Sequence, residues 1–168
     1  MSGARRSDGE LRRQLADQMD ARSAHVDFAR VIEGLPAELR GRRPEGFPHS
    51  PWEILEHMRL AQEDILEYSR NPDWVSPEWP AGYWPSSPEP LDEAAWEASV
   101  AAFRRDLAAM RALVADPAND LLAPFPWSDE GADGANLLRE ALLVGDHNAY
   151  HLGQLVDVRR LLGAWPPS

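Results

Sequence analysis

Residues 50–68 read SPWEILEHMRLAQEDILEY, and the first four of them carry a strong set of helix-start signals. Ser50 can cap the free backbone N–H groups at the start of a helix, and Pro51 suits the first helical position. Glu53 lies three residues after the cap, where its carboxylate can bond back to the cap and complete a capping box. We therefore expect a helix to open at this point.

Apolar side chains follow this start at alternating spacings of four and three residues. The stripe consists of Ile54, Met58, Ala61, Ile65 and Tyr68. That spacing places its members on one face of a helix, and such a face is stable only when another element covers it. We expect this helix to end before Asn71-Pro72, with His57 bordering the apolar stripe.

Three other segments have the same helical spacing. The first covers residues 7–33 and carries a stripe of Leu11, Leu15, Met19, Val26, Ala29 and Ile32. Another begins near Pro90, and its stripe consists of Trp96, Val100, Phe103, Leu107, Met110 and Val114. The last covers residues 133–162, with a stripe of Leu137, Ala141, Val144, Asn148, His151, Leu155, Val158 and Leu162. Two polar residues, Asn148 and His151, interrupt the middle of that stripe and need an explanation.

No segment shows the alternation typical of a β-strand, so we expect an all-α fold in which four helices bury their stripes around one axis, a four-helix bundle. Residues 71–90 connect the second and third helices and contain six prolines. This link is longer than an antiparallel hairpin requires, and a crossover of that length would let the two helices run parallel. Its aromatic residues either cover one end of the bundle as a lid or line a substrate pocket. They are Trp74, Trp79, Tyr83 and Trp84.

The composition excludes several classes of protein. The chain fits a single domain, residues 1–168, and its 43% hydrophobic and 27% charged residues are ordinary for a globular protein. A net charge of −11 would repel a phosphate backbone, so we expect no nucleic-acid partner. The apolar runs are too short to span a bilayer and the N-terminus lacks the apolar region of a signal peptide. We therefore expect no membrane partner and a cytoplasmic protein.

Three residue types are absent, and each absence removes a kind of chemistry. The chain has no cysteine, no lysine and no threonine. It therefore cannot use a thiolate of its own, form a Schiff base or build a phosphate-binding lysine loop. Any thiol chemistry requires a thiol brought by a cofactor or substrate.

Two histidines lie four residues apart in the last predicted helix, so His147 and His151 share one helical face about 6 Å apart at the backbone. Such a pair alone is equally consistent with two core histidines that have ordinary partners. Because His57 borders the apolar face of another helix, however, three imidazoles should point into the bundle together. A buried imidazole without a partner costs roughly 1–3 kcal/mol, and one cation would satisfy all three. We predict that His57, His147 and His151 hold one divalent metal ion with an open position.

Three polar residues near these histidines each have two interpretations. Gln154, one turn after His151, either supports a metal ligand or contacts a substrate, or it is an ordinary polar residue at the helix edge. Glu53 and Asp64 share the helical face of His57, so either could orient its ring or act as a base. A capping role already explains Glu53.

The remaining polar candidates are less informative. Asn148 stands where a zincin protease has the glutamate of its H-E-x-x-H motif, which argues against that class. His25 has no partner at metal-ligand spacing, and His49 precedes a helix cap in a proline-flanked loop. We expect both to be surface or capping residues, and the sequence assigns no catalytic or cofactor-binding residue.

The sequence resembles the DinB-like (YfiT-like) superfamily most specifically in two segments, SPWEILEH at residues 50–57 and DHNAYHLGQ at residues 146–154. Residues 120–127 and the Trp/Pro-rich link are also similar to members of this superfamily. The resemblance implies an up-down-down-up bundle and a divalent metal held by three histidines that match His57, His147 and His151. It also implies a homodimer.

Characterised members of that superfamily include metal-dependent transferases that use low-molecular-weight thiols such as bacillithiol, mycothiol or glutathione. The resemblance therefore implies a thiol S-transferase or a hydrolase-like enzyme acting on a small-molecule substrate. The alternative is a non-catalytic metal-binding module for stress response or dimeric interaction. A metal-free bundle with three incidental core histidines is the third hypothesis. The sequence does not choose among Zn, Ni, Fe, Mn and Cu, because imidazole ligands suit all of them in different degrees.

Overall fold

The computed structural model describes residues 2–20, 24–128 and 134–166, with side chains from Ser7 onward. Five α-helices and two short 3₁₀ helices are found there. The α-helices are α1 (Ser2–Met19), α2 (Phe28–Ile32), α3 (Pro51–Arg70), α4 (Glu93–Ala115) and α5 (Leu137–Leu161), and the 3₁₀ helices are η1 (Ala37–Leu39) and η2 (Ala81–Tyr83). No strand occurs in these residues, which confirms the all-α class.

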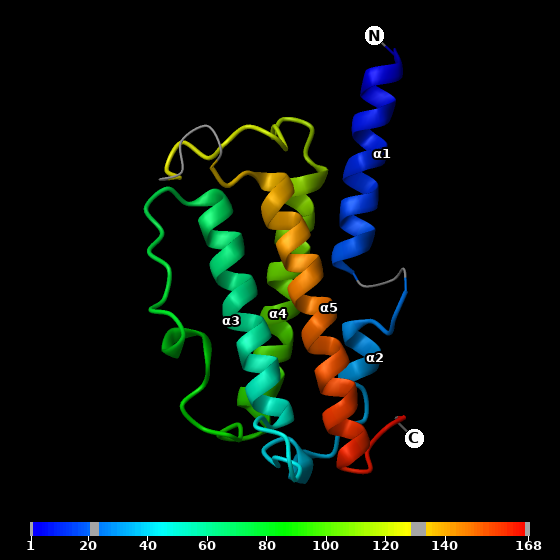
Figure 1. Cartoon of the computed structure of the whole chain (residues 1–168), viewed down its shortest axis with the longest axis vertical. Coiled ribbons are helices and arrows are strands. Elements are labelled where there is room, and N and C mark those ends of the chain that lie inside the picture. Colours follow the sequence, from blue (N-terminus) through cyan, green and yellow to red (C-terminus); the bar gives the residue numbers. More distant parts are fainter. Residues whose placement is uncertain (1, 21–23, 129–133, 167–168) are drawn as a thin grey trace.

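The four long helices lie side by side (Figure 1). Helices α3 and α4 run in one direction, whereas α1 and α5 run in the other. The link between α3 and α4 returns along the outside of the bundle from one end to the other, which is what allows these two helices to be parallel. Helix α1 projects beyond its neighbours at its N-terminal end, and the short α2 packs beside the C-terminal half of α5.

Side-chain caps fix where the helices begin. Ser50 accepts a hydrogen bond from the Glu53 backbone while the Glu53 carboxylate bonds back to Ser50, so the expected capping box is present. Asp92 caps α4 and Asn136 caps α5 by accepting a hydrogen bond from the backbone N–H three residues later, without a reciprocal bond. The predicted third and fourth helices therefore begin a few residues later than their apolar spacing alone suggested. Residue 133, the predicted start of the last helix, lies outside the described residues.

The predicted first helix, residues 7–33, is wrong as one continuous element. The structure divides it into α1 and α2, and the Asp27 side chain caps the second of these by accepting from the Arg30 backbone at 2.9 Å. Because α2 begins a new helix, the residues that face the core after this point differ from those of one continuous helix. Hence Val26, from the predicted stripe, is exposed, whereas Phe28 and Val31 are buried.

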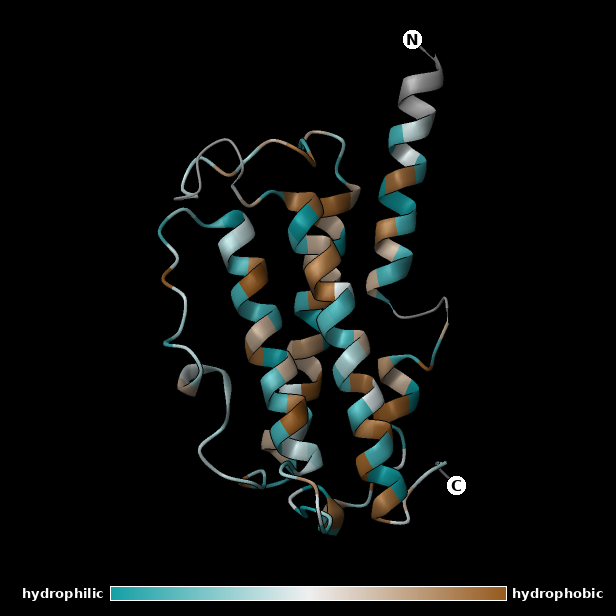
Figure 2. Ribbon diagram, in the orientation of Figure 1, coloured by the Kyte–Doolittle hydropathy of each residue, from teal (hydrophilic) through white to brown (hydrophobic). Residues whose placement is uncertain are grey.

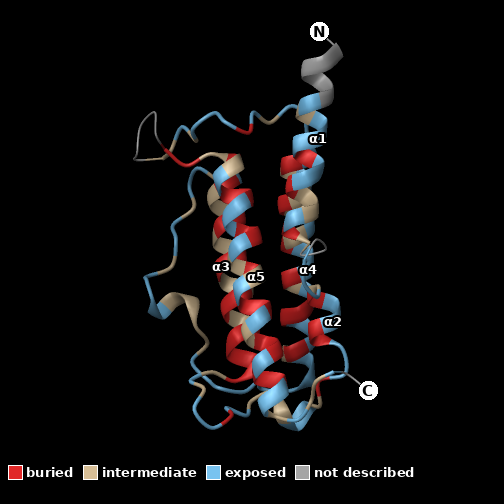
Figure 3. Cartoon of the chain, turned by 45° about the vertical axis from the view of Figure 1, so that its right-hand side comes forward, coloured by how far each residue is buried: buried red, intermediate tan, exposed pale blue. Residues whose placement is uncertain are grey.

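The buried apolar residues form two clusters, one at each end of the bundle. One cluster joins α2, α3, α4 and α5 around residues such as Ile54, Phe103 and Leu155, and the other joins α1 to the opposite halves of α3, α4 and α5. Apolar residues and buried surfaces run along the facing sides of the helices (Figures 2 and 3). No helix in the described part of the chain combines the length and the apolarity needed to cross a membrane.

One buried arginine ties the C-terminal end of α5 to its surroundings. Arg159 is fully buried and donates hydrogen bonds to the backbone carbonyls of Val31, Glu33 and Ala164. The bonds to Glu33 and Ala164 measure 2.9 and 3.0 Å. These carbonyls end α2 and begin the C-terminal tail, so one guanidinium holds two segments against the bundle.

Replacing Arg159 tests this connection. Arg159→Met should lower the free energy of unfolding by about 3 kcal/mol, because it leaves buried carbonyls without a charged donor. The neighbouring Arg160 is exposed and pairs only with Asp157 on the surface, so Arg160→Met should cost about 0.5 kcal/mol or less. Urea unfolding measures both, and equal losses would contradict the assigned role.

Candidate metal centre

The structure brings the three predicted histidines together. His57 comes from α3, His147 and His151 come from α5, and one ring nitrogen of each lies within 4.8 Å of the others. The closest pair is Nε2 of His57 and Nε2 of His147, 3.2 Å apart. His57 and His151 are buried and His147 is half-buried. The site therefore lies between two antiparallel helices. On α5 it spans one helical turn, from His147 to His151.

Two of the rings are oriented by hydrogen-bond acceptors on their outer side. Nδ1 of His57 lies 2.9 Å from the carbonyl oxygen of Tyr83, and Nδ1 of His151 lies 2.7 Å from Oε1 of Gln154. Carbonyl and amide oxygens only accept hydrogen bonds, so both Nδ1 atoms carry the proton. Each Nε2 is then a lone pair directed at the other histidines. Gln154 is thus a direct hydrogen-bond partner of His151 and not an isolated polar residue at the helix edge.

The link between α3 and α4 reaches the site and is fastened to α3 by Asp64. The carboxylate of Asp64 accepts from Trp74 Nε1 and from the Tyr83 hydroxyl, both at 2.7 Å. Tyr83 therefore contacts α3 twice, through its hydroxyl to Asp64 and through its carbonyl to His57. Asp64 has no hydrogen bond to His57, and the only connection between them in the described residues runs through Tyr83.

The aromatic residues of the link have three different environments. The Trp84 indole stacks on His57 with ring centroids 4.1 Å apart and planes 4° apart, so it lines the site. Trp74 and Tyr83 fasten the link, whereas the Trp79 side chain is 72% exposed. A lid over one end of the bundle is therefore wrong for this segment, because the link lies along the side of α3.

His49 is a residue of the site that the sequence analysis placed at the surface. Its ring stacks on Trp84 at 4.2 Å, so the indole lies between His49 and His57. His49 is half-buried, and its ring nitrogens have no hydrogen bond to another described residue. No spacing rule connects a loop histidine to an indole 35 positions later in the chain. Only the path of the link reveals this contact.

Glu53 has no part in the site. Its carboxylate bonds to Arg43 and to the backbone N–H of Ser50 at 2.8 Å. The capping role explains it fully. No carboxylate in the described part of the chain hydrogen-bonds to His57, His147 or His151.

Burial keeps the three imidazoles neutral. Loss of solvent lowers the pKa of His57 below its usual value, and it lowers the pKa of His147 to about 4 with a further contribution from the charge of His57. Burial, followed by the neighbouring charges of His147 and His57, lowers the pKa of His151 to about 3. At neutral pH all three rings therefore offer lone pairs, which is the protonation state that a metal ion requires.

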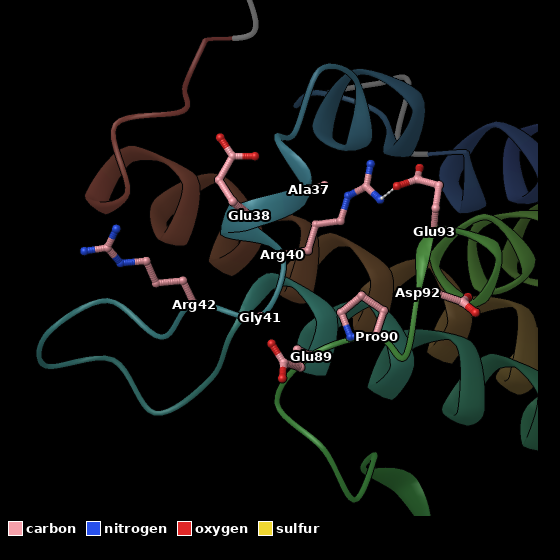
Figure 4. Close-up of a pocket in the computed structure, with 9 residues that line it drawn as sticks. All are labelled: Ala37, Glu38, Arg40, Gly41, Arg42, Glu89, Pro90, Asp92 and Glu93. Atoms are coloured by element: carbon pink, nitrogen blue, oxygen red, sulfur yellow. Dashed lines mark hydrogen bonds and ion pairs between the residues drawn. The ribbon is translucent and has the colours of Figure 1, made fainter.

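A second polar cleft, of about 360 Å³, lies where the loop after η1 meets the start of α4 (Figure 4). Arg40 crosses it to pair with Glu93 at 2.5 Å and lies over the Trp96 ring at 4.6 Å. Its charged side chains are of both signs and it contains no histidine. This cleft therefore does not compete with the histidine site as a candidate metal centre.

Comparison with known families agrees with the histidine site. The family model described as the DinB superfamily matches residues 21–155, which include all three histidines. The searches of curated proteins and of solved structures gave no significant match.

The neutral imidazoles make the metal-free protein sensitive to acid. In the unfolded chain a histidine takes up its proton near pH 6.5, whereas folded His147 and His151 do so only near pH 4 and 3. The unfolded state binds more protons between these values, so stability should fall as the pH is lowered from about 6.5 toward 4.

Urea unfolding midpoints in the presence of a chelator, measured at pH 7, 6 and 5, test this expectation. His151→Asn should make the decline shallower, because one depressed pKa is removed. His25→Asn is the matched control, since His25 is exposed. The same pH dependence in both variants would contradict the assignment.

Proposed function

The chain belongs to the DinB superfamily, and we propose that His57, His147 and His151 bind one divalent metal ion in a metal-dependent transferase that uses a low-molecular-weight thiol. The observation that carries the proposal is the convergence of three neutral imidazoles on one point. Two of them have their Nδ1 protons held on the outside by Tyr83 and Gln154.

The donor set fits a transition metal. Three imidazole nitrogens suit Zn, Ni, Fe, Mn or Cu, and they leave at least one coordination position free, which is the pattern of catalytic sites. Without a cation, Nε2 of His57 and Nε2 of His147 face each other at 3.2 Å inside the protein, which is unfavourable if both are lone pairs. A bound divalent ion would supply Lewis acidity, which favours the thiolate form of a coordinated thiol.

The protein's own residues would orient the histidine rings and shield them from water. The Tyr83 carbonyl and the Gln154 amide hold two rings in place, and Trp84 covers one face of His57 against water. His49 stacks on Trp84 as well, so the indole is held between two histidine rings. Because the chain has no cysteine, the sulfur must come from the cofactor.

A non-catalytic metal-binding module is the second candidate. This candidate is favoured by the lack of a carboxylate that could act as acid or base at the site. Glu53 and Asp64 are hydrogen-bonded to other residues, and neither contacts the histidines. In that case the metal would stabilise the bundle without turnover. Both candidate functions are compatible with the homodimer that the family resemblance implies. Light scattering of the purified protein tests whether it is a dimer.

Metal content is the first test. Untagged protein purified without a nickel column should contain about one equivalent of a transition metal by elemental analysis. His147→Ala should lose that metal together with the rise in melting temperature that added metal gives to the native protein. His25→Ala should retain both. Native protein that binds no transition metal would overturn both proposed functions.

Turnover separates the two candidates. Metal-loaded protein should conjugate monochlorobimane to bacillithiol, mycothiol or glutathione at a rate that depends on the metal. His147→Gln, which removes one of the proposed metal ligands, should abolish the metal-dependent rate. His25→Gln should have no effect. Bound metal without conjugation of any of the three thiols would favour the non-catalytic module.

A further inference from the structure

Asp64 lies on α3 two helical turns after His57, and both of its carboxylate oxygens are bonded to the link between α3 and α4. Oδ1 accepts from Trp74 Nε1 and Oδ2 accepts from the Tyr83 hydroxyl, each at 2.7 Å. Seven residues of helix separate Asp64 from His57 by about 10 Å along the axis. Any effect of Asp64 on the histidine must therefore pass through another residue.

A nearby buried side chain of α3 serves the bundle itself. Gln62 accepts from Nδ2 of Asn148 at 2.9 Å and donates to the Phe103 carbonyl at 2.7 Å. These bonds join α3 to α5 and α4, and they give Asn148, one of the two polar residues in the stripe of α5, a partner. The bonds of Asp64 instead leave the bundle and end on the link.

Tyr83 is the residue through which Asp64 reaches His57. The hydroxyl of Tyr83 binds Asp64, and its backbone carbonyl oxygen lies 2.9 Å from Nδ1 of His57. Among the described residues, every hydrogen bond between residues 74–87 and α3 ends on Asp64 or His57. The bond from Tyr83 to Asp64 is therefore what holds this carbonyl in front of the histidine.

The turn at η2 is compact enough to carry the position of the hydroxyl to the carbonyl. The backbone N–H of Gly82 donates to the Glu78 carbonyl at 2.7 Å, and that of Tyr83 donates to the Pro80 carbonyl at 3.2 Å. Gly82 also lies so close to Pro77 that a Cβ atom on the glycine would be 2.6 Å from the Cβ of the proline. Side chain and backbone of Tyr83 are thus held in one fixed unit.

We propose that Asp64 is a positioning residue for the metal centre. By holding the Tyr83 hydroxyl, it fixes the carbonyl that accepts the Nδ1 proton of His57 and the adjacent Trp84 indole that stacks on the same ring. This inference rests on the proposed metal site and extends it to a residue outside the ligand set. The outer acceptor of a metal-bound histidine sets the orientation and the basicity of the ring. Displacing that acceptor should therefore weaken metal binding although no ligand is changed.

The two bonds of Asp64 offer a matched pair of variants. Tyr83→Phe removes the hydroxyl and keeps the backbone carbonyl, whereas Trp74→Phe removes the other donor to the same carboxylate. A purely structural role predicts that both variants lower the melting temperature of the metal-free protein and that neither changes the Zn²⁺ affinity. The positioning role predicts that only Tyr83→Phe changes the affinity.

Competition with a chromophoric chelator measures the dissociation constant for Zn²⁺. That constant should rise about 10-fold in Tyr83→Phe and in Asp64→Leu. The double variant should bind no more weakly than either single variant, because both changes break the same connection. Asp64→Asn should keep near-native affinity, since its amide oxygen accepts from Trp74 and its NH₂ group donates to the Tyr83 oxygen. Additive losses in the double variant, or native affinity in Tyr83→Phe, would overturn the positioning role.

A second measurement needs no metal. Long-range ¹H–¹⁵N NMR spectra of the chelator-treated protein report which nitrogen of His57 carries the proton, and the stacked indole shifts the ring protons of His57 upfield. The native protein and Trp74→Phe should show the Nδ1–H tautomer with shifted protons, and Tyr83→Phe a mixture of tautomers with smaller shifts. An unchanged His57 spectrum in Tyr83→Phe would contradict the proposal. Native protein that binds no Zn²⁺ but shows these spectral changes would refute the metal site and retain the positioning of His57.

Discussion

The structure depends on one requirement, which is that three imidazoles must be buried at neutral charge with their lone pairs facing each other. Burial alone lowers the pKa of each ring. A neutral imidazole still carries one N–H group, and inside a protein that group needs an acceptor. The fold supplies acceptors on the outer side of the His57 and His151 rings, so the inner Nε2 of each of these rings is left as a lone pair. A small cation is the natural complement to such an arrangement.

The architecture around the histidines can be understood as the means of placing those acceptors. Helices α3 and α5 pack antiparallel, and one ring nitrogen of His57 lies within 4.8 Å of those of His147 and His151. The long link between α3 and α4 carries the Tyr83 carbonyl to His57 and stacks Trp84 on the same ring. Fastening by Asp64 explains how a proline-rich segment without regular structure is held in register with a helix. The link is therefore part of the site as well as a connection.

Much of the fold follows from local chemistry, which is why the sequence predicts it. The capping box at Ser50 and the apolar stripes of α3, α4 and α5 depend on residues within a few turns of each other. The division of the first helix was missed, because a cap at Asp27 competes with an apolar spacing that continues almost unbroken across it. The pattern of apolar residues alone does not decide between one helix and two. Packing of α2 against α5 selects the form with two helices.

The sequence by itself determined the helical class, the start of α3 and the three candidate histidines, since periodicity, capping and ligand spacing depend mostly on neighbouring residues. It did not determine what surrounds those histidines. His49, Tyr83 and Trp84 reach the site through a link whose path depends on contacts with α3. Gln62 meets Asn148 across 86 positions of the chain. These acceptors and ring contacts join distant segments, and only the packed bundle decides which of them meet.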